Sequence, residues 1–303
     1  MLYFLEDKEE ISLLKFLGKF QYMNSDDTKY FFTSNSYYKK RIKKLVDNQY
    51  LKKEDNMLFL TSRGTRYLKS IDCECVRPNS KPDYIPRLLY LSNLGAFYYN
   101  CPTVTFTPSY QLKDNECYTM TSRRYIGLFN INGVKYLSYH ILKKHDNRYK
   151  GSVSYDIDKE TQYRNIIILV EDISKINLEN FTFGYNSILI VEDNETNKER
   201  LKYLNSINWH KIITNEYKNA DLSPHIYCDY EDSKGNYISY FYFYDTEKVN
   251  RINQFLAINK DKQATIFCSK ELKPLLQQNI IKAKYNVIDI DKLVDRKKNI
   301  YYG

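Results

Sequence analysis

The chain has 303 residues, of which 43% are hydrophobic and 27% are charged, a composition typical of a protein with a packed core. Nine glycines and seven prolines are too few for a collagen-like or linker-rich chain. No run approaches the roughly 18 consecutive apolar residues of a membrane-spanning helix. The sequence begins MLYFLEDKEE, with acids where a secretory signal would carry bases and a longer apolar run. We therefore expect a soluble, cytoplasmic protein with no membrane partner.

The charge balance and the cysteines limit the classes of site. Lys and Arg (46) outnumber Asp and Glu (37), and the net charge of +9 is by itself only a weak indication of a nucleic-acid partner. The six cysteines form no Cys-x-x-Cys motif, and Cys73 and Cys75 stand too close together for a usual structural zinc pair. The four histidines show no metal-ligand spacing, and no glycine-rich phosphate loop occurs. The sequence thus predicts free thiols, no metal ion and no cofactor.

The N-terminal region shows the clearest succession of elements. Apolar residues at helical spacing alternate with capping clusters such as Ser25-Asp26-Asp27, and two β-prone segments flank the polar Glu54-Asp55-Asn56. In chain order we expect a helix, a short helix, a third helix, the two strands of a hairpin and a last helix, at residues 9–20, 25–32, 36–48, 50–53, 57–60 and 62–71. This order is typical of a winged helix-turn-helix domain.

The third of these helices separates apolar from basic side chains. A helical wheel at about 100° per residue gives it one apolar stripe, formed by Tyr38, Ile42, Leu45 and Val46. The rest of the helix is basic, and the segment 36–53 holds seven bases against one acid, Asp47. Such a face can neutralise phosphates and reach base edges in the major groove. The alternative interpretation is a solvated face of a lysine-rich protein. We predict that the DNA-contacting residues are Ser36, Tyr37, Lys39, Lys40, Arg41, Lys43, Lys44, Lys52, Lys53 and Arg63.

The run IKKLVDNQYLKKEDNMLFLTSRGTRYL resembles the helix, wing and following helix of many bacterial winged-helix regulators. Leu45, Tyr50-Leu51 and the segment Leu60-Thr61-Ser62-Arg63-Gly64, a Leu-Thr-x-x-Gly signature, match the pattern of these regulators, whereas Gln49 stands where they more often have glycine. With the mixed α/β sequence that follows, the chain also resembles the replication-relaxation family of plasmid and mobile-element proteins. That resemblance implies a second domain with a restriction-endonuclease-like fold.

The sequence predicts an α+β winged helix at residues 1–72, a proline-containing linker at 73–86 and a mixed α/β domain at 87–303, with an internal division near 210–224. In the α/β domain we expect a helix, a strand, a hairpin, two buried strands, a helix, a second hairpin and a helix–strand–helix–strand run, at residues 87–99, 103–107, 124–142, 166–170, 188–191, 195–207, 225–244, 247–258, 264–268, 270–278 and 287–290. The hairpins contain similar segments, 132–139 and 234–240, a hint of internal repetition. Six aromatic residues within 237–244 suggest base stacking, although a strand would bury half of them in any case.

A nuclease site of the restriction-endonuclease type needs a carboxylate on one strand and Asp/Glu-x-Lys on the next, which together hold Mg²⁺. The corresponding hairpin, residues 125–144, contains no Asp or Glu. A competing acid cluster consists of Asp156, Asp158 and Glu160 and of the strand-end pairs Glu171-Asp172 and Glu192-Asp193. Acids at the carboxyl ends of strands are where α/β folds place their sites, but such acids are equally typical of helix caps and turns. We therefore expect no catalytic residues.

The function expected from these features is site-specific binding of duplex DNA in a plasmid, phage or other mobile element. The binding would act in replication, relaxation or transcriptional control, and the α/β domain would serve homodimerisation or partner contact. Two alternatives stay open. One is a metal-dependent DNA-nicking enzyme, and the other is a ligand-responsive transcriptional regulator.

Overall fold

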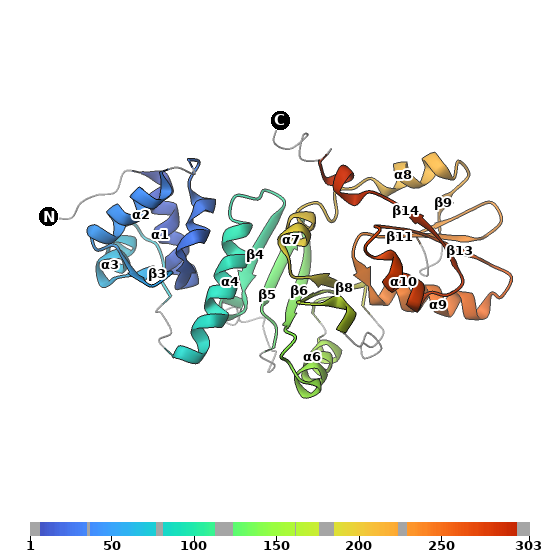
Figure 1. Ribbon diagram of the computed structural model, residues 1–303, viewed down its shortest axis with the longest axis horizontal. Coiled ribbons are helices and arrows are strands. Elements are labelled where there is room, and N and C mark those ends of the chain that lie inside the picture. Colours follow the sequence, from blue (N-terminus) through green and yellow to red (C-terminus); the bar gives the residue numbers. More distant parts are fainter. Residues whose placement is uncertain are drawn as a thin grey trace. The chain divides into compact units, whose positions relative to one another are not determined.

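The computed structural model contains helices and several β-sheets, which confirms a mixed α+β architecture (Figure 1). The chain divides into two compact units, residues 1–115 and 116–303. Within the described part of the chain, no helix combines the length and the apolar character needed to cross a membrane. The residues that the structure describes are 7–34, 37–76, 81–112, 124–160, 162–175, 185–223 and 229–295.

The first unit begins with the predicted succession of helices and a hairpin, which is confirmed. Its elements are α1 (Lys8–Phe20), β1 (Tyr22–Asn24), the 3₁₀ helix η1 (Ser25–Phe31), α2 (Tyr38–Asp47), β2 (Leu51–Glu54), β3 (Met57–Leu60) and α3 (Ser62–Ser70). The sequence does not predict β1, because three residues give too short an alternation. β1 pairs antiparallel with β3, which pairs antiparallel with β2, so the strand order is β1, β3, β2.

The helices of this unit enclose a small apolar core. Leu13 and Leu14 of α1, Leu45 of α2, Leu58 of β3 and Leu68 of α3 are completely buried. Burial of each such side chain stabilises the fold by about 1.5–3 kcal/mol. Because Leu45 is anchored in this core, the opposite side of α2 is held towards solvent.

The helix α4 (Ile85–Phe97) packs against β1 and η1, so it belongs to the first unit. Asn93 Nδ2 donates to Asp27 Oδ1 at 3.1 Å, and a Cβ on Gly95 would lie less than 3.0 Å from the Phe20 ring. β4 (Val104–Pro108) and α5 (Ser109–Leu112) follow. The chain thus divides after residue 115 and not at the expected linker, 73–86. The prolines of that segment indicate irregular backbone, but they do not reveal that the next helix, α4, packs against β1 and η1 of the first unit.

The second unit contains two sheets. In the first, β5 (Gly127–Ile131) and β6 (Val134–Ile141) form a hairpin whose turn residues, Asn132 and Gly133, have φ of 51° and 84°. After α6 (Asn147–Lys159), β7 (Asn165–Val170) pairs parallel with β6. The 3₁₀ helix η3 (Ile173–Lys175) precedes β8 (Ser187–Glu192), which pairs parallel with β7 and antiparallel with β12 (Tyr244–Asp245).

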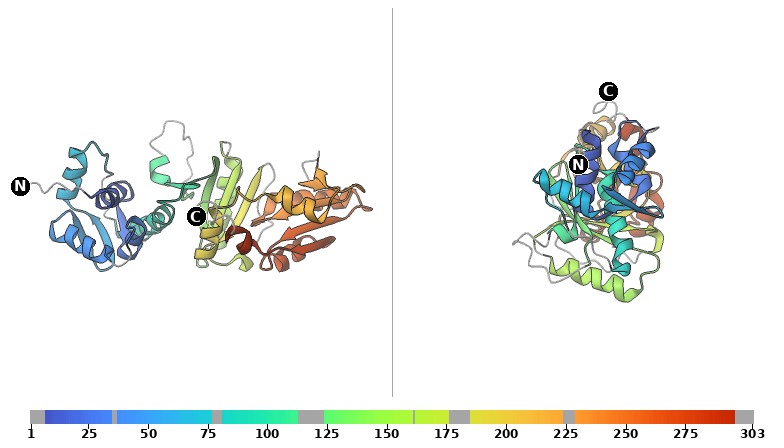
Figure 2. Two further views of the ribbon diagram at one scale, coloured as in Figure 1. Left: turned by 90° about the horizontal axis from the view of Figure 1, so that it is seen from above. Right: turned by 90° about the vertical axis from the view of Figure 1, so that its left-hand side faces the viewer.

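The second sheet has the strand order β14, β13, β11, β10, β9. Its strands are β9 (Asp221–Leu222), β10 (Tyr230–Glu231), β11 (Tyr237–Phe241), β13 (Ala264–Cys268) and β14 (Ala283–Val287). The helices that precede or connect these strands are α7 (Glu195–Leu201), α8 (Trp209–Glu216), α9 (Thr246–Ile258) and α10 (Lys273–Asn279). Figure 2 shows the two groups of strands, one coloured green to yellow and the other orange to red.

The two sheets share one connectivity, in agreement with the hint of repetition in the sequence. In each, an antiparallel hairpin leads through a helix to a strand parallel to the second hairpin strand, and one more parallel strand follows. The hairpin glycines Gly133 and Gly235 both have positive φ, 84° and 70°. The buried serines of the matching segments pair with buried isoleucines, Ser138 with Ile167 and Ser239 with Ile266.

Several expected elements differ from the structure. Residues 237–244 are not one strand, because β11 lies in the second sheet and β12 in the first. The two aromatic side chains between these strands are buried, with Tyr242 about 5% and Phe243 about 4% exposed. The helix expected at 195–207 ends at Leu201. The strand expected at 287–290 ends at Val287, because Asp289 Oδ1 accepts from the Lys292 amide at 3.1 Å and helical residues follow from 290. Residues 225–228 of the second expected hairpin lie outside the described residues.

Candidate functional site

The helix α2 exposes one continuous row of lysines. Leu45 is completely buried and Ile42 is 7% exposed, whereas Tyr38 and Val46 are half-buried. On the other faces of the helix the four lysines are exposed, whereas Arg41 is half-buried. In β2, Leu51 is buried and the three residues that follow it are exposed. We call this surface the lysine face, and it comprises Lys39, Lys40, Lys43 and Lys44 of α2 and Lys53 of β2. The predicted separation of apolar and basic sides of this helix is confirmed.

The helix and the hairpin border one hollow. This hollow has a volume of about 260 Å³ and is lined by Ser25, Asp26, Tyr38, Lys39, Ile42, Lys53 and Asn56. Because Lys39 of α2 and Lys53 of β2 both line it, these two basic side chains lie on the same side of the unit. The hairpin turn is held there by η1, since the Ser25 amide donates to the Asn56 carbonyl oxygen at 2.8 Å and Asn56 Nδ2 donates to Asp26 Oδ2 at 3.2 Å.

Arg41 is used differently from the lysines around it. Its guanidinium forms ion pairs with Asp7 and Glu9, lies 3.5 Å from Glu10 Oε1, and stacks over the Phe32 ring at 4.6 Å. The structure therefore places this predicted contact residue where it ties α2 to the start of α1. Lys44 Nζ also lies 3.7 Å from Glu10 Oε1.

Asp7 and Glu9, which pair with Arg41, are held in their charged form. Burial raises the pKa of the Asp7 carboxyl, but hydrogen bonds from the Glu10 and Glu9 amides and the charge of Arg41 outweigh burial, and the pKa is lowered. A hydrogen bond from the Thr33 amide, at 2.9 Å, is the largest cause that lowers the pKa of Glu9, and Arg41 adds to it. Around neutral pH the acids therefore neutralise Arg41, and the positive charge of this surface comes from the lysines.

Among the described residues, Lys40, Lys43 and Lys53 have no carboxylate partner. Lys52 pairs with Glu54 at 2.5 Å, and Lys40 Nζ lies 5.0 Å from the centre of the Tyr37 ring. Tyr37, just before α2, is 56% exposed. The predicted contact residue Ser36 lies outside the described residues. Arg63 belongs to the first turn of α3, and its guanidinium lies 5.1 Å from the centre of the Tyr50 ring.

The Leu-Thr-x-x-Gly signature has a clear structural basis. The Thr61 side chain caps α3 by accepting hydrogen bonds from the amides of Arg63 and Gly64, at 3.2 and 3.1 Å. The Thr61 amide donates to the Tyr50 carbonyl oxygen at 3.1 Å. A Cβ on Gly64 would lie less than 3.0 Å from that same oxygen. The two residues together join α3 closely to the start of the hairpin, and this fixes the position of β2 beside α2.

In the second unit, the acids at the strand ends are bound to neighbouring groups. Asp193 contacts His140 Nε2 at 3.3 Å and Lys198 Nζ at 2.9 Å. Glu171 Oε2 accepts from the Lys143 amide at 2.6 Å, and Asp172 Oδ1 accepts from the Ser174 amide at 3.1 Å. Glu171 and Asp172 thus have the backbone-binding role that the sequence left open, whereas Asp193 forms ion pairs.

The acids near α6 differ in burial and in their contacts. The helix α6 itself is not predicted from the sequence. On it, Asp156 is buried and Asp158 is exposed. Glu160 Oε1 accepts from the amides of Gln162 and Tyr163, at 2.6 and 2.9 Å. Among the described residues, no group of three or more His, Cys, Asp or Glu side chains is placed to hold a metal ion.

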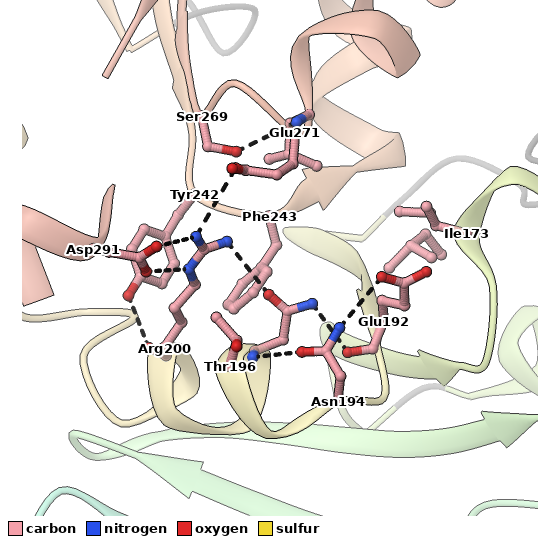
Figure 3. Close-up of a pocket in the computed structure, with 13 residues that line it drawn as sticks. Ile173, Glu192, Asn194, Thr196, Arg200, Tyr242, Phe243, Ser269, Glu271 and Asp291 are labelled. Carbon is pink, nitrogen blue, oxygen red and sulfur yellow. Dashed lines mark hydrogen bonds and ion pairs between the residues drawn. The ribbon is translucent and has the colours of Figure 1, made fainter. Parts of the chain in front are cut away.

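The structure also contains a cavity that the sequence does not reveal. It lies in the second unit where β8 and β13 end, and has a volume of about 390 Å³ (Figure 3). Glu192, Arg200 and Asp291 line it although they are far apart in the sequence. No local motif marks such a site, because only the packing of the two sheets brings its residues together.

No protein-family model matches this chain, and no curated protein or solved structure is significantly similar to it.

Proposed function

We propose that the first unit is a winged helix that binds duplex DNA, with α2 in the major groove and the hairpin β2–β3 as the wing. The single observation that carries this proposal is the separation of faces on α2, which buries Ile42 and Leu45 and turns its lysines to solvent. The element order and the strand order β1, β3, β2 support it, because they place a hairpin beside the exposed face of a helix.

The charges of the lysine face suit a polyanion. Duplex DNA carries one negative charge per roughly 1.7 Å of its axis, and cations that neutralise its phosphates release condensed counterions. Lysines on two elements that border one hollow can contact the backbone on either side of a groove. Because acids neutralise Arg41, recognition of the DNA bases would depend on Tyr37, Lys40 and Lys43. Lys39 and Lys53 would contact the neighbouring phosphates.

For the second unit we propose a supporting role without DNA cleavage, on a degenerate restriction-endonuclease-like frame. The hairpin β5–β6, the helix α6 and the parallel strand β7 follow in the order that such a frame requires, and the hairpin lacks carboxylates. The chain would act at a specific site of a plasmid, phage or other mobile element, as the resemblance to the replication-relaxation family suggests. The second unit would then supply dimerisation or partner contacts.

The wing can be tested by changing Lys53 to Ala. We expect the affinity to fall severalfold and by the same factor on A/T-rich and G/C-rich duplexes, because a phosphate contact is independent of base identity. The slope of log affinity against log salt should become less negative by about 0.9, the value for one phosphate contact. Fluorescence anisotropy of full-length wild type and variant over a salt series measures both quantities.

The matched control is Lys69→Ala, which removes an exposed lysine of α3 that is not part of the lysine face. It should leave the affinity and the salt slope unchanged. A Lys53→Ala loss confined to one duplex would show that the wing reads bases. Wild-type protein that fails to bind any duplex at low salt would contradict the proposed function as a whole.

A further inference from the structure

The cavity of the second unit lies at the carboxyl ends of parallel strands from both sheets. Glu192 ends β8, and Ser269 and Glu271 follow β13. Open α/β sheets bind their ligands at this edge, because the strand ends and the following loops leave a crevice there. The volume of about 390 Å³ lies within the range of about 300–1,000 Å³ that is usual for small-molecule sites.

One side of the cavity is closed by an ion pair. Arg200, which is 9% exposed, donates from Nε and Nη2 to the two carboxylate oxygens of Asp291, both at 2.8 Å. Its guanidinium also lies 3.9 Å from Glu271. Because these carboxylates occupy the guanidinium, this side offers little attraction to an anionic ligand.

On another side of the cavity, a carboxylate lacks such compensation. In Figure 3, Glu192 lies beside Ile173, across Phe243 from Arg200. Its Oε2 accepts a hydrogen bond from Asn194 Nδ2 at 3.3 Å, and among the described side chains no cation pairs with it. Apolar surface of Ile190 and Phe243 lines the same cavity.

These two sides determine the chemistry of a suitable ligand. Three carboxylates and a single guanidinium line the cavity, so its charge is −2. A partly enclosed carboxylate next to apolar surface interacts best with an organic cation, since a strongly hydrated metal ion would have no use for the apolar walls. We propose that this cavity binds a small organic ammonium ion with an apolar body, its ammonium group at Glu192 and its body against Ile190 and Phe243. The proposal is independent of DNA binding.

Three probes of one shape and different charge test this inference on the full-length protein. Tryptamine is a cation, N-acetyltryptamine is its neutral derivative, and indole-3-propionate is an anion of similar size. We expect tryptamine to raise the melting temperature and to give a saturable isotherm in titration calorimetry, because binding to the folded state stabilises it. The other two should bind at least roughly tenfold more weakly, since they cannot form the charge-assisted hydrogen bond.

Two variants locate the site. Glu192→Gln should weaken tryptamine binding by roughly tenfold, whereas Glu195→Gln, an exposed acid three residues away outside the cavity lining, should leave it unchanged. No saturable binding of tryptamine, equal binding of the neutral or anionic probe, or equal loss in both variants would each overturn the proposal. The probe comparison needs only the wild-type chain, so it decides the question even if a variant does not fold.

Discussion

Reversal of two charges on α2, Lys40→Glu together with Lys43→Glu, should weaken duplex binding at least about a hundredfold. Both side chains are exposed and, among the described residues, have no carboxylate partner. In the proposed complex the substitutions would therefore put two negative charges directly against the phosphates. Neither residue contributes to the buried stripe of Ile42 and Leu45, so the fold should be retained. Fluorescence anisotropy with a labelled duplex of about 30 base pairs at low salt measures the change without knowledge of the target sequence.

The matched control carries Lys15→Glu and Lys69→Glu, which alter the net charge by the same amount at exposed positions of α1 and α3 in the same unit. It should bind nearly as well as wild type, with only the small loss that overall charge produces. Equal weakening in both double variants would mean that net charge alone matters. A folded Lys40→Glu/Lys43→Glu protein with wild-type affinity would place the DNA elsewhere.

The second large effect concerns Gly64. The substitution Gly64→Ala should lower the free energy of unfolding of the first unit by about 3 kcal/mol, because the added methyl group would collide with the Tyr50 carbonyl oxygen and backbone cannot move aside cheaply. The displaced α3 would also shift the hairpin, so DNA affinity should fall with stability. Urea denaturation followed by circular dichroism measures the loss, with binding measured below the transition.

Gly151→Ala provides the comparison, since a Cβ at that position of α6 meets no atom within 4 Å. It should be neutral or stabilise the protein by about 0.5–1 kcal/mol, because alanine restricts the unfolded chain and favours helix. Unchanged stability in Gly64→Ala would show that the close approach of α3 to the Tyr50 carbonyl oxygen does not exist in solution.

Features set by neighbouring residues could be predicted from the sequence. The apolar stripe of α2 follows from the spacing of Ile42 and Leu45, and the hairpin turn at Asn132-Gly133 follows from two residues that tolerate positive φ. Features that depend on residues far apart in the sequence could not be predicted from it. α4 joins the first unit through Gly95 and Phe20, which are 75 positions apart, and the strand expected at 237–244 changes sheet because of partners that no local pattern identifies.

The same distinction applies to the candidate sites. The lysine face is visible in the sequence because one helix carries most of it. The role of Arg41 is not visible in the sequence, because its partners Asp7 and Glu9 lie at the N-terminal end of α1. A helical wheel shows only that the residue is basic. The cavity is the extreme case, since Arg200 and its partner Asp291 are separated by 91 residues.

The central claim, that α2 lies against DNA, is tested most directly by photo-crosslinking. A benzoylphenylalanine in place of Tyr37 stands beside the lysine face, and one in place of Tyr155 stands on α6 of the second unit; the native side chains are 56% and 62% exposed. Each full-length variant is irradiated with the same labelled duplex at low salt. We predict a strong crosslink from position 37 and little or none from position 155. A crosslink from position 155 with none from position 37 would contradict the proposed interface.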